Sequence, residues 1–256
     1  MFPVQDQALS ALRGGQAVNA ALAQPSHAAS VFVPKGIDIR PERMLRIMGY
    51  REGAPVRPAV YRTASAMAEL AQAAIAPVIH DCRVTVSRCD NDGLLLSDGT
   101  AFRGPVFAKY LDGCEAAVAF ILTLGGRFDS TAKNLVSGGN MLEAVFLETA
   151  GWVAVEGATQ LYADHLTQRV RGEGMQLTRR LAPGYSFRVG GRKAEWPLED
   201  QKPLFGLFAG RQLPVEIMES CAMTPKMSRT GFYGLRTMPT SIPAPDLGGH
   251  TSGAKR

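Results

Sequence analysis

One apolar segment decides the fold class of this chain: Val118-Ala119-Phe120-Ile121-Leu122-Thr123-Leu124, which ends at Gly125-Gly126. A run this apolar is typical of a strand covered on both faces, and the glycine pair marks its end. Between Met141 and Val170, apolar residues recur at three- and four-residue steps, which predicts one long helix. Gly151 and Gly157 each cost such a helix about 1 kcal/mol relative to Ala. They therefore indicate either close packing against another element or a break near residue 151.

The remaining segments give shorter patterns. Val84 and Val86 alternate with polar neighbours, and turns are predicted at Asn91-Asp92-Gly93 and Ser97-Asp98-Gly99, which together indicate a β-meander. The other expected elements are helices over residues 40–50 (stopped by Gly49), 59–75 and 199–209, and strands over residues 215–223 and 229–235. These elements predict an α+β fold, with helices packed against a mainly antiparallel sheet.

The ends of the chain differ from its middle in composition. Residues 1–30 are rich in Ala, Gln, Ser and Gly, and residues 238–256 carry Pro, Gly and terminal Lys and Arg. We expect the first segment to be a flexible arm and the second a flexible tail. Residues 31–237 then form one folded unit, because a chain of 256 residues can bury a single sizeable core.

Composition narrows the classes of function. The chain is 46% hydrophobic and 20% charged, which is ordinary for a folded protein. The net charge of +5 is modest and comes partly from the terminal Lys and Arg, which argues against nucleic-acid binding. No apolar run reaches the roughly 18–20 residues that span a bilayer, and no secretory signal pattern opens the chain. We expect a cytoplasmic protein that does not enter a membrane.

Residues that carry metal or nucleophilic chemistry are scattered. The four cysteines include no CxxC pair, and the four histidines form no HExxH pattern. We expect buried or incidental thiols, no metal site and no catalytic side chain. The DxHxxG signature of corrinoid-carrying modules is also absent, so we do not expect the chain to hold cobalamin itself.

The best candidate for ligand chemistry is Arg180-Leu181-Ala182-Pro183-Gly184-Tyr185. The guanidinium of Arg180 matches a carboxylate in a bidentate geometry. Pro183 and Gly184 shape the backbone so that it can present polar groups, and Tyr185 offers a ring face. The alternative interpretation is an ordinary Pro-Gly turn.

Two further pieces follow along the chain, and one residue that precedes them belongs to the same set. Residues 196–201 (Trp-Pro-Leu-Glu-Asp-Gln) predict a helix start with Trp196 as a possible core anchor. Residues 219–225 lead to a second turn at Gly231-Phe232-Tyr233, where Tyr233 either contacts a ligand or is the core aromatic of a hairpin. Glu156 lies on the apolar face of the long helix, where it either answers a ligand's positive charge or pairs with an arginine.

Taken in order, these pieces resemble the activation domain of cobalamin-dependent methionine synthase, and in particular its stand-alone members. The resemblance covers about residues 35–236 and adds Met48-Gly49-Tyr50 and Thr123-Leu124-Gly125 to the pieces above. It implies the same α+β fold and a shallow groove for S-adenosylmethionine (SAM). In that groove Arg180 would hold the carboxylate of SAM, and the backbone around Ala182, Pro183 and Gly184 would hold the adenosyl part. Tyr185, Tyr233 and, by a weaker correspondence, Glu156 would border the ligand.

The resemblance also implies a function. The chain would support reductive remethylation of an oxidised corrinoid on a separate corrinoid-binding methyltransferase. Methionine synthase is the first candidate for that enzyme. The chain would act as an accessory component, with cobalamin present only through the partner and a flavodoxin- or ferredoxin-type reductant supplying the electron. Three alternatives stay open: an activator of a different corrinoid methyltransferase, a non-catalytic SAM-binding or interaction protein, and a nucleic-acid-associated protein suggested only by net charge.

Two departures from that family stand out. Residues 186–195 are inserted between the Gly-Tyr pair and the Trp-Pro step, and this basic segment either covers the ligand or contacts an acidic partner. Residues 226–230 (Lys-Met-Ser-Arg-Thr) replace a more usual Lys-Ser-x-Ser run, which changes the expected surroundings of the ligand.

Overall fold

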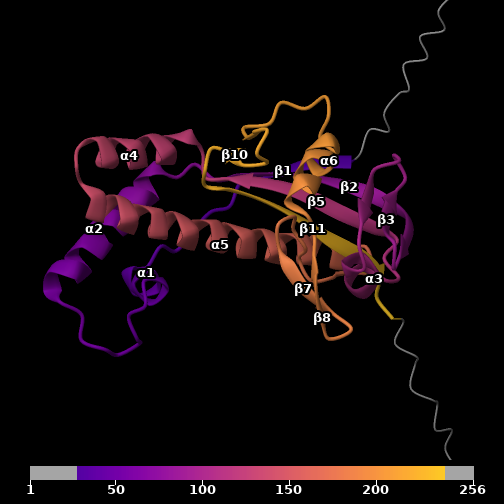
Figure 1. The fold of residues 1–256 in the computed structure, drawn as a ribbon, viewed down its shortest axis with the longest axis horizontal. Helices are drawn as coiled ribbons and strands as arrows, with labels where there is room; N and C mark the ends of the chain where they lie inside the picture. The colour runs from indigo at the N-terminus through magenta and orange to yellow at the C-terminus, as the bar shows by residue number, and fades with distance from the viewer. Residues whose placement is uncertain (1–27, 240–256) are drawn as a thin grey trace, which may run out of the picture.

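A seven-stranded sheet forms the centre of the molecule (Figure 1). The computed structural model describes residues 28–239. The strand order is β4-β3-β2-β5-β11-β6, with β1 also paired to β2, and every pairing in the described part of the chain is antiparallel. The strands are β1 (Ala28–Phe32), β2 (Val78–Asp90), β3 (Gly93–Leu96), β4 (Ala101–Arg103), β5 (Ala116–Thr123), β6 (Met175–Leu177) and β11 (Ser228–Thr237).

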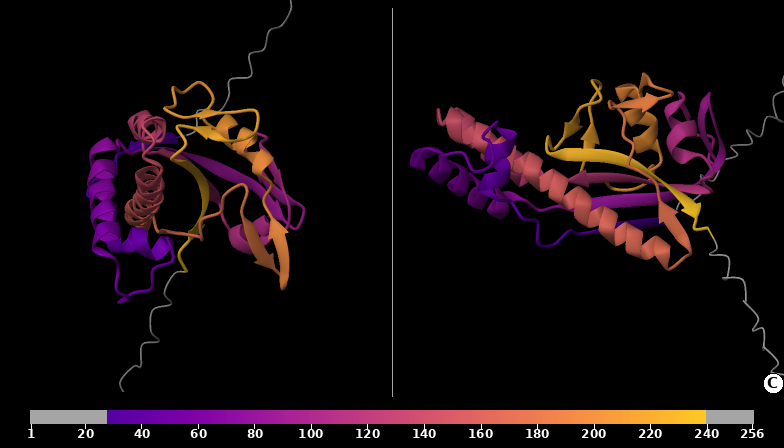
Figure 2. Two further views of the ribbon diagram at one scale, coloured as in Figure 1. Left: turned by 60° about the vertical axis from the view of Figure 1, so that its left-hand side comes forward. Right: turned by 90° about the horizontal axis from the view of Figure 1, so that it is seen from below.

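Helices cover both faces of this sheet and create two cores. The larger core lies under α1 (Pro41–Ile47), α2 (Pro58–Ala74), α4 (Gly126–Ser137) and α5 (Met141–Arg171). The smaller core lies under α3 (Val106–Leu111) and α6 (Gln201–Gly206). Figure 2 shows α5 running obliquely along one face of the sheet and beyond it, toward α1 and α2. The predicted α+β class, with helices on a mainly antiparallel sheet, is confirmed.

Strand β5 serves both cores, as its continuous apolar sequence predicts. All its residues are buried. Phe120 and Leu122 contribute to the larger core, whereas Ala119 and Ile121 contribute to the smaller one. This alternation explains why a central strand has no polar face.

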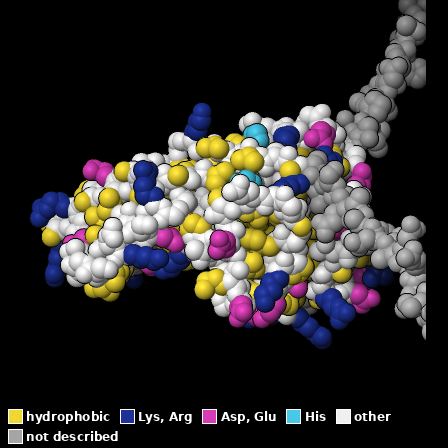
Figure 3. Space-filling model, turned by 90° about the horizontal axis from the view of Figure 1, so that it is seen from above, with side chains coloured by type: hydrophobic (Ala, Val, Ile, Leu, Met, Phe, Trp, Pro, Cys, Tyr) yellow, Lys and Arg dark blue, Asp and Glu magenta, His cyan; other side chains and the backbone are white. Residues whose placement is uncertain are grey.

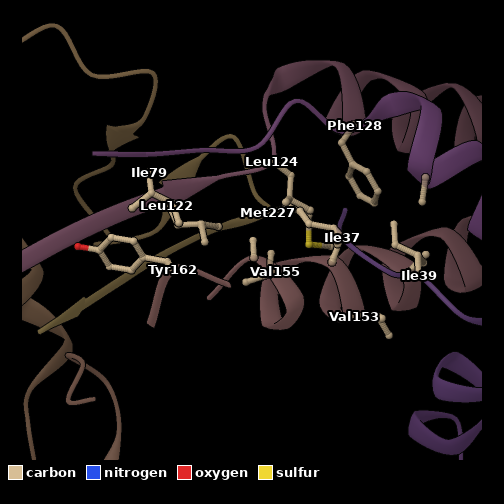
Figure 4. Close-up of a cluster of buried hydrophobic side chains, with 14 of the residues drawn as sticks. Ile37, Ile39, Ile79, Leu122, Leu124, Phe128, Val153, Val155, Tyr162 and Met227 are labelled. Carbon is tan, nitrogen blue, oxygen red and sulfur yellow. The ribbon is translucent and has the colours of Figure 1, made fainter. Parts of the chain in front are cut away.

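Helix α5 is unbroken through both of its glycines. A Cβ atom added at Gly151 would lie 2.7 Å from Cζ of Phe128 and 3.0 Å from Sδ of Met227. Of the two explanations for this glycine, close packing is therefore the correct one. Figure 4 shows this core, with Leu122 and Tyr162 toward one end, Phe128 and Ile39 toward the other, and Met227 between them.

Besides its backbone pairing with β2, the N-terminal strand β1 is linked to α5 through one buried carboxylate. Asp81, only 2% exposed, accepts hydrogen bonds from Ser30 Oγ (2.8 Å), from Tyr162 Oη (2.9 Å) and, more weakly, from Arg169 (3.4 Å). These contacts connect β1, β2 and α5. The folded unit therefore includes residues 28–30, which composition placed in the arm. The rest of the predicted arm and most of the predicted tail lie outside the described residues.

Two sequence predictions in the last third of the chain are wrong in detail. Instead of one strand over residues 215–223, two two-residue strands, β9 (Glu216–Ile217) and β10 (Met223–Thr224), pair around a turn. Cys221 in that turn has a φ of 64°, which is incompatible with a continuous strand. Gly231 is not in a turn but lies inside β11, opposite Phe120.

The predicted helix over residues 199–209 is shorter than expected. It consists of a 3-10 turn, η1 (Leu198–Asp200), followed by α6. The inserted segment forms a hairpin of β7 (Ser186–Val189) and β8 (Arg192–Glu195). Among the helices described, none is long and apolar enough to cross a membrane.

Candidate functional site

A groove of about 670 Å³ opens where the C-terminal part of the chain meets α5. This volume is in the range of small-molecule sites. Its lining comes from residues 182–185, 195–199, 221–223 and 226–230, together with Trp152, Val155 and Gln201. Figure 3 shows that the face seen from above exposes a group of hydrophobic side chains near its middle, bordered by charged side chains of both signs.

The first wall of the groove is the loop 180–185, which is held by backbone hydrogen bonds on both sides. Leu181 exchanges two bonds with Phe232 of β11 (2.9 and 2.8 Å). The Gly184 N–H donates to the Trp196 carbonyl (2.8 Å), and the Trp196 N–H donates to the Tyr185 carbonyl (3.1 Å). Gly184 has a φ of +79°, a conformation that favours glycine. The predicted Pro-Gly turn is therefore a rigid wall of the groove.

Trp196 anchors this wall to the smaller core. Its side chain is fully buried and meets Phe102, Phe107 and Phe232 edge-to-face at centroid distances of 5.0–6.1 Å. The indole Nε1–H donates to Asp200 Oδ2 (2.8 Å). The structure therefore supports the core-anchor interpretation of Trp196, although the residue also contributes to the groove lining.

The second wall is positioned by a buried amide. Gln201 is 4% exposed; its Nε2 donates to the Cys221 carbonyl (2.7 Å), and its Oε1 accepts from the Thr230 hydroxyl (3.2 Å). One side chain thus connects α6, the turn after β9 and strand β11. Beyond the turn, the Lys226 N–H donates to Asp129 of α4 (2.6 Å). The wall is rigid because each of its segments is bonded to a helix.

Arg180 has an unusual environment for a cation. Its guanidinium carbon lies 5.4 Å from the centre of the Tyr185 ring. Its Nη1 atom is buried and has no hydrogen-bond partner among the described residues. An unsatisfied buried guanidinium nitrogen is costly, so this atom is available to donate a hydrogen bond to a negatively charged group beside the groove.

Glu156 is paired with an arginine, as one of its two interpretations predicts. Arg229 Nη1 donates to Glu156 Oε2 (2.7 Å) and to Thr159 Oγ1 (3.0 Å). Partial burial alone would raise the pKa of Glu156, but the hydrogen bond and charge of Arg229, with Arg180 and Arg43 further away, hold it below its usual value. Arg229 itself lines the groove and is only 10% exposed.

Tyr233 lies in the larger core rather than in the groove lining. It is 5% exposed, and its ring stacks on Phe120 at 5.7 Å. Burial is the main reason that its pKa rises to about 12, against the opposing charges of Arg180 and Arg229. The other predicted residues divide into two groups: Ala182, Pro183, Gly184 and Tyr185 line the groove, whereas Arg180 and Glu156 stand beside it.

Sequence analysis did not single out two apolar side chains of the lining, one of which lies within the segment 196–201. Trp152 is 56% exposed and belongs to α5, and Leu198 is 42% exposed at the start of η1. Their spacing alone could not distinguish an exposed apolar residue from a core residue. Charges of both signs, from Glu199 and Arg229 among others, complete the lining. This mixture of charged and apolar groups suits a zwitterionic ligand with an apolar part. Within residues 28–239, no cluster of His, Cys, Asp and Glu could hold a metal ion.

Comparisons with known proteins give one informative result. No protein-family model matches the chain, and no curated protein matches it. Among solved structures, the MetH reactivation domain bound to AdoHcy superposes with a TM-score of 0.56. The match covers 84% of this chain and 81% of the other, at 15% sequence identity. This chain has the fold of the MetH reactivation domain. At this identity the likeness concerns the fold alone, which agrees with the α+β arrangement described above.

Proposed function

We propose that the groove binds S-adenosylmethionine and that the chain is a reactivation module for a separate corrinoid methyltransferase. Methionine synthase is the first candidate for this partner enzyme. The fold neighbour was solved with AdoHcy, the demethylated form of SAM. The groove has the volume and mixed polarity that a ligand of this kind requires. The proposal rests on the fold neighbour, on the volume and polarity of the groove, and on the hydrogen-bonding state of one arginine side chain.

The observation that carries the proposal is the unpartnered Nη1 of Arg180. A ligand carboxylate would satisfy this atom with a charge-assisted hydrogen bond, which is stronger than a neutral one. The neighbouring backbone of Ala182, Pro183 and Gly184 is already fixed and would receive the adenosyl part without reordering. Such preorganisation lowers the entropic cost of binding. Tyr185 would border the bound ligand.

The carboxylate of Glu156 would pair with a positive charge of the ligand. Its Oε2 bonds to Arg229, and its Oε1 has no partner among the described residues. We propose that Oε1 receives the ammonium or the sulfonium. In this arrangement Arg229 keeps Glu156 ionised and oriented, and Tyr233 supports the site from the core side.

In the proposed reaction the chain contributes binding and orientation. SAM supplies the methyl group, a flavodoxin- or ferredoxin-type reductant supplies the electron, and the cobalamin stays on the partner protein. The chain would hold the methyl sulfonium in line with its acceptor. Binding in this geometry lowers the entropic part of the barrier, because the two reacting groups no longer have to find the right orientation by collision. The chain is thus an accessory component of a methyltransferase.

Calorimetric titration of SAM and AdoHcy into the full chain tests the ligand site. We expect Arg180→Ala to weaken binding by about 1.5–3 kcal/mol, because a hydrogen bond to a charged group is lost. Arg179→Ala is the matched control, since Arg179 is the exposed neighbour and does not line the groove. Absence of binding at millimolar SAM, or equal losses in both variants, contradicts the assignment.

A second assay tests the reactivation role. An oxidised corrinoid methyltransferase is incubated with SAM and a reductant, with and without the chain. Recovery of turnover that requires the chain, and is lost in Arg180→Ala, is the expected result. Binding of SAM without any recovery with methionine synthase or another corrinoid methyltransferase would instead identify a SAM-binding protein that does not reactivate such enzymes.

A further inference from the structure

A basic surface lies on the side of the molecule formed by α3 and the inserted hairpin. It consists of Lys109, Arg179, Arg188, Arg192 and Arg236, and the name basic surface refers to these residues below. We propose that it docks an acidic face of a partner protein. This proposal does not depend on SAM binding.

The structure places the hairpin against α3. Phe187 packs against Tyr110 at a centroid distance of 5.7 Å. Lys109 Nζ (2.5 Å) and Tyr110 Oη (3.2 Å) both donate to the Arg188 carbonyl. Of the hairpin strands, only Glu195 at the base contributes to the groove lining. Between the two interpretations of the insertion, these contacts favour a partner-facing element over a cover for the ligand.

A shallow hollow beside the hairpin collects three of the cations. It has a volume of about 270 Å³, and its lining contains Lys109, Arg179 and Arg236 without any acidic residue. The guanidinium of Arg179 lies 5.7 Å from the Tyr110 ring centre and 5.9 Å from that of Phe187. These ring contacts hold Arg179 in place while leaving its donors without a carboxylate.

The arginines of the hairpin also lack counter-charges in the described part of the chain. Among the residues described, no carboxylate forms an ion pair with Arg179, Arg188 or Arg192, whereas Lys193 is paired with Glu195 at 2.5 Å. In the hairpin register Arg188 lies directly opposite Lys193. Like charges in such cross-strand positions are destabilising. Glu195 balances the charge of Lys193, whereas a carboxylate of an acidic partner would balance that of Arg188.

The nature of the surface favours a protein over a nucleic acid. Proteins that bind single strands offer exposed aromatic rings for stacking. Here the Tyr110 ring is already occupied by Lys109 and Arg179, and its hydroxyl is bonded to the hairpin. Duplex binding depends on many phosphate contacts along a basic track. The five cations come from α3, the hairpin, the loop after β6 and strand β11. Such a group instead matches a compact set of carboxylates, which arginine binds bidentately.

Fluorescence anisotropy with labelled poly-L-glutamate tests the proposal in the full chain at low salt. The test variant is the triple substitution Arg179→Gln, Arg188→Gln and Arg192→Gln. The control is Arg51→Gln, Arg57→Gln and Arg62→Gln, which removes the same charge from exposed residues around α2. Because three exposed ion pairs are lost, we expect about a tenfold weaker Kd in the test variant, and less than about a twofold change in the control.

Two outcomes would overturn the proposal. Equal losses in both triple variants would mean that poly-L-glutamate responds only to net charge. Tighter binding of a 20-nucleotide single strand or duplex than of poly-L-glutamate, lost in the test variant alone, would assign the surface to nucleic acid. Neither outcome depends on SAM, so failure of the proposed function would be seen separately in the calorimetric titration.

Discussion

The substitution Gly231→Ala tests how tightly β11 packs against the centre of the sheet. A Cβ atom added at Gly231 would lie 2.3 Å from Cε1 and 2.5 Å from Cζ of Phe120, and 3.3 Å from Cδ of Arg180. The first two distances are far inside van der Waals contact. Because Phe120 is fully buried, its ring has no free space to move into.

The expected cost combines three contributions. Ala in place of Gly favours a strand by about 0.5–1 kcal/mol. Overpacking of a dense core costs about 1–3 kcal/mol. Displacement of the Phe120 ring also disturbs its contacts with Tyr162 at 5.1 Å and Tyr233 at 5.7 Å, each worth about 0.5–1.5 kcal/mol. We expect a net loss of about 2–3 kcal/mol, or a decrease in Tm of about 5–10 °C for a domain of this size.

Urea unfolding, followed by fluorescence of buried Trp196, measures this loss. Gly206→Ala is the matched control, because Gly206 is exposed near the end of α6 and an added Cβ would meet nothing within 4 Å. The control should be unchanged or more stable by up to about 1 kcal/mol. In the background Phe120→Leu the cost of Gly231→Ala should shrink, since the clashing ring is gone. If Gly231→Ala is as stable as the wild type, the close approach of Phe120 is not the reason for this glycine.

Two further predictions concern stability. Gln201→Leu should lower the free energy of unfolding by about 2–4 kcal/mol, because the Cys221 carbonyl and the Thr230 hydroxyl lose their shared partner; an unchanged urea midpoint would contradict this. Asp200→Asn and Glu156→Gln should depend on pH in opposite ways. Burial raises the pKa of Asp200, so the fold loses stability as pH rises from the ordinary value of 3.8 through this raised pKa, and Asp200→Asn should be spared that loss. The pKa of Glu156 is lowered despite partial burial, because its arginine partner outweighs that effect; its contribution is therefore present at pH 7 and is lost as pH falls below its ordinary value of 4.5. Unfolding curves between pH 3 and 7 would show both trends, and trends of the same sign would contradict the assignment.

The elements that sequence analysis located well are those with strong local patterns. The apolar run 118–124 corresponds to β5, and the three- and four-residue periodicity corresponds to α5. The two predicted Gly-containing turns connect the strands of the β2-β3-β4 meander. Periodicity and turn chemistry act between neighbouring residues, so one sequence is enough to reveal them. The Arg-x-x-Pro-Gly-Tyr segment was recognised for the same reason.

The errors concern residues whose conformation depends on distant partners. The sequence predicts a turn at Gly231, whereas in the structure this glycine lies within β11 and admits the ring of Phe120. The segment around Cys221 has strand-like composition, but its backbone is set by Gln201 from another element. Trp152 is exposed because it borders the groove, and which neighbours a helix face meets is not determined by helical spacing.

The sequence by itself determined the α+β class, the main helices and strands, and the composition of the loop at residues 180–185. Only the tertiary structure decided which charges meet. Arg229 reaches Glu156 across 73 residues of sequence, and Arg180 is left with a buried nitrogen that no residue of the described range 28–239 satisfies. The physical reason is that helix and strand propensities act over a few residues, whereas charge pairing and close packing are set by which elements the folded chain brings together.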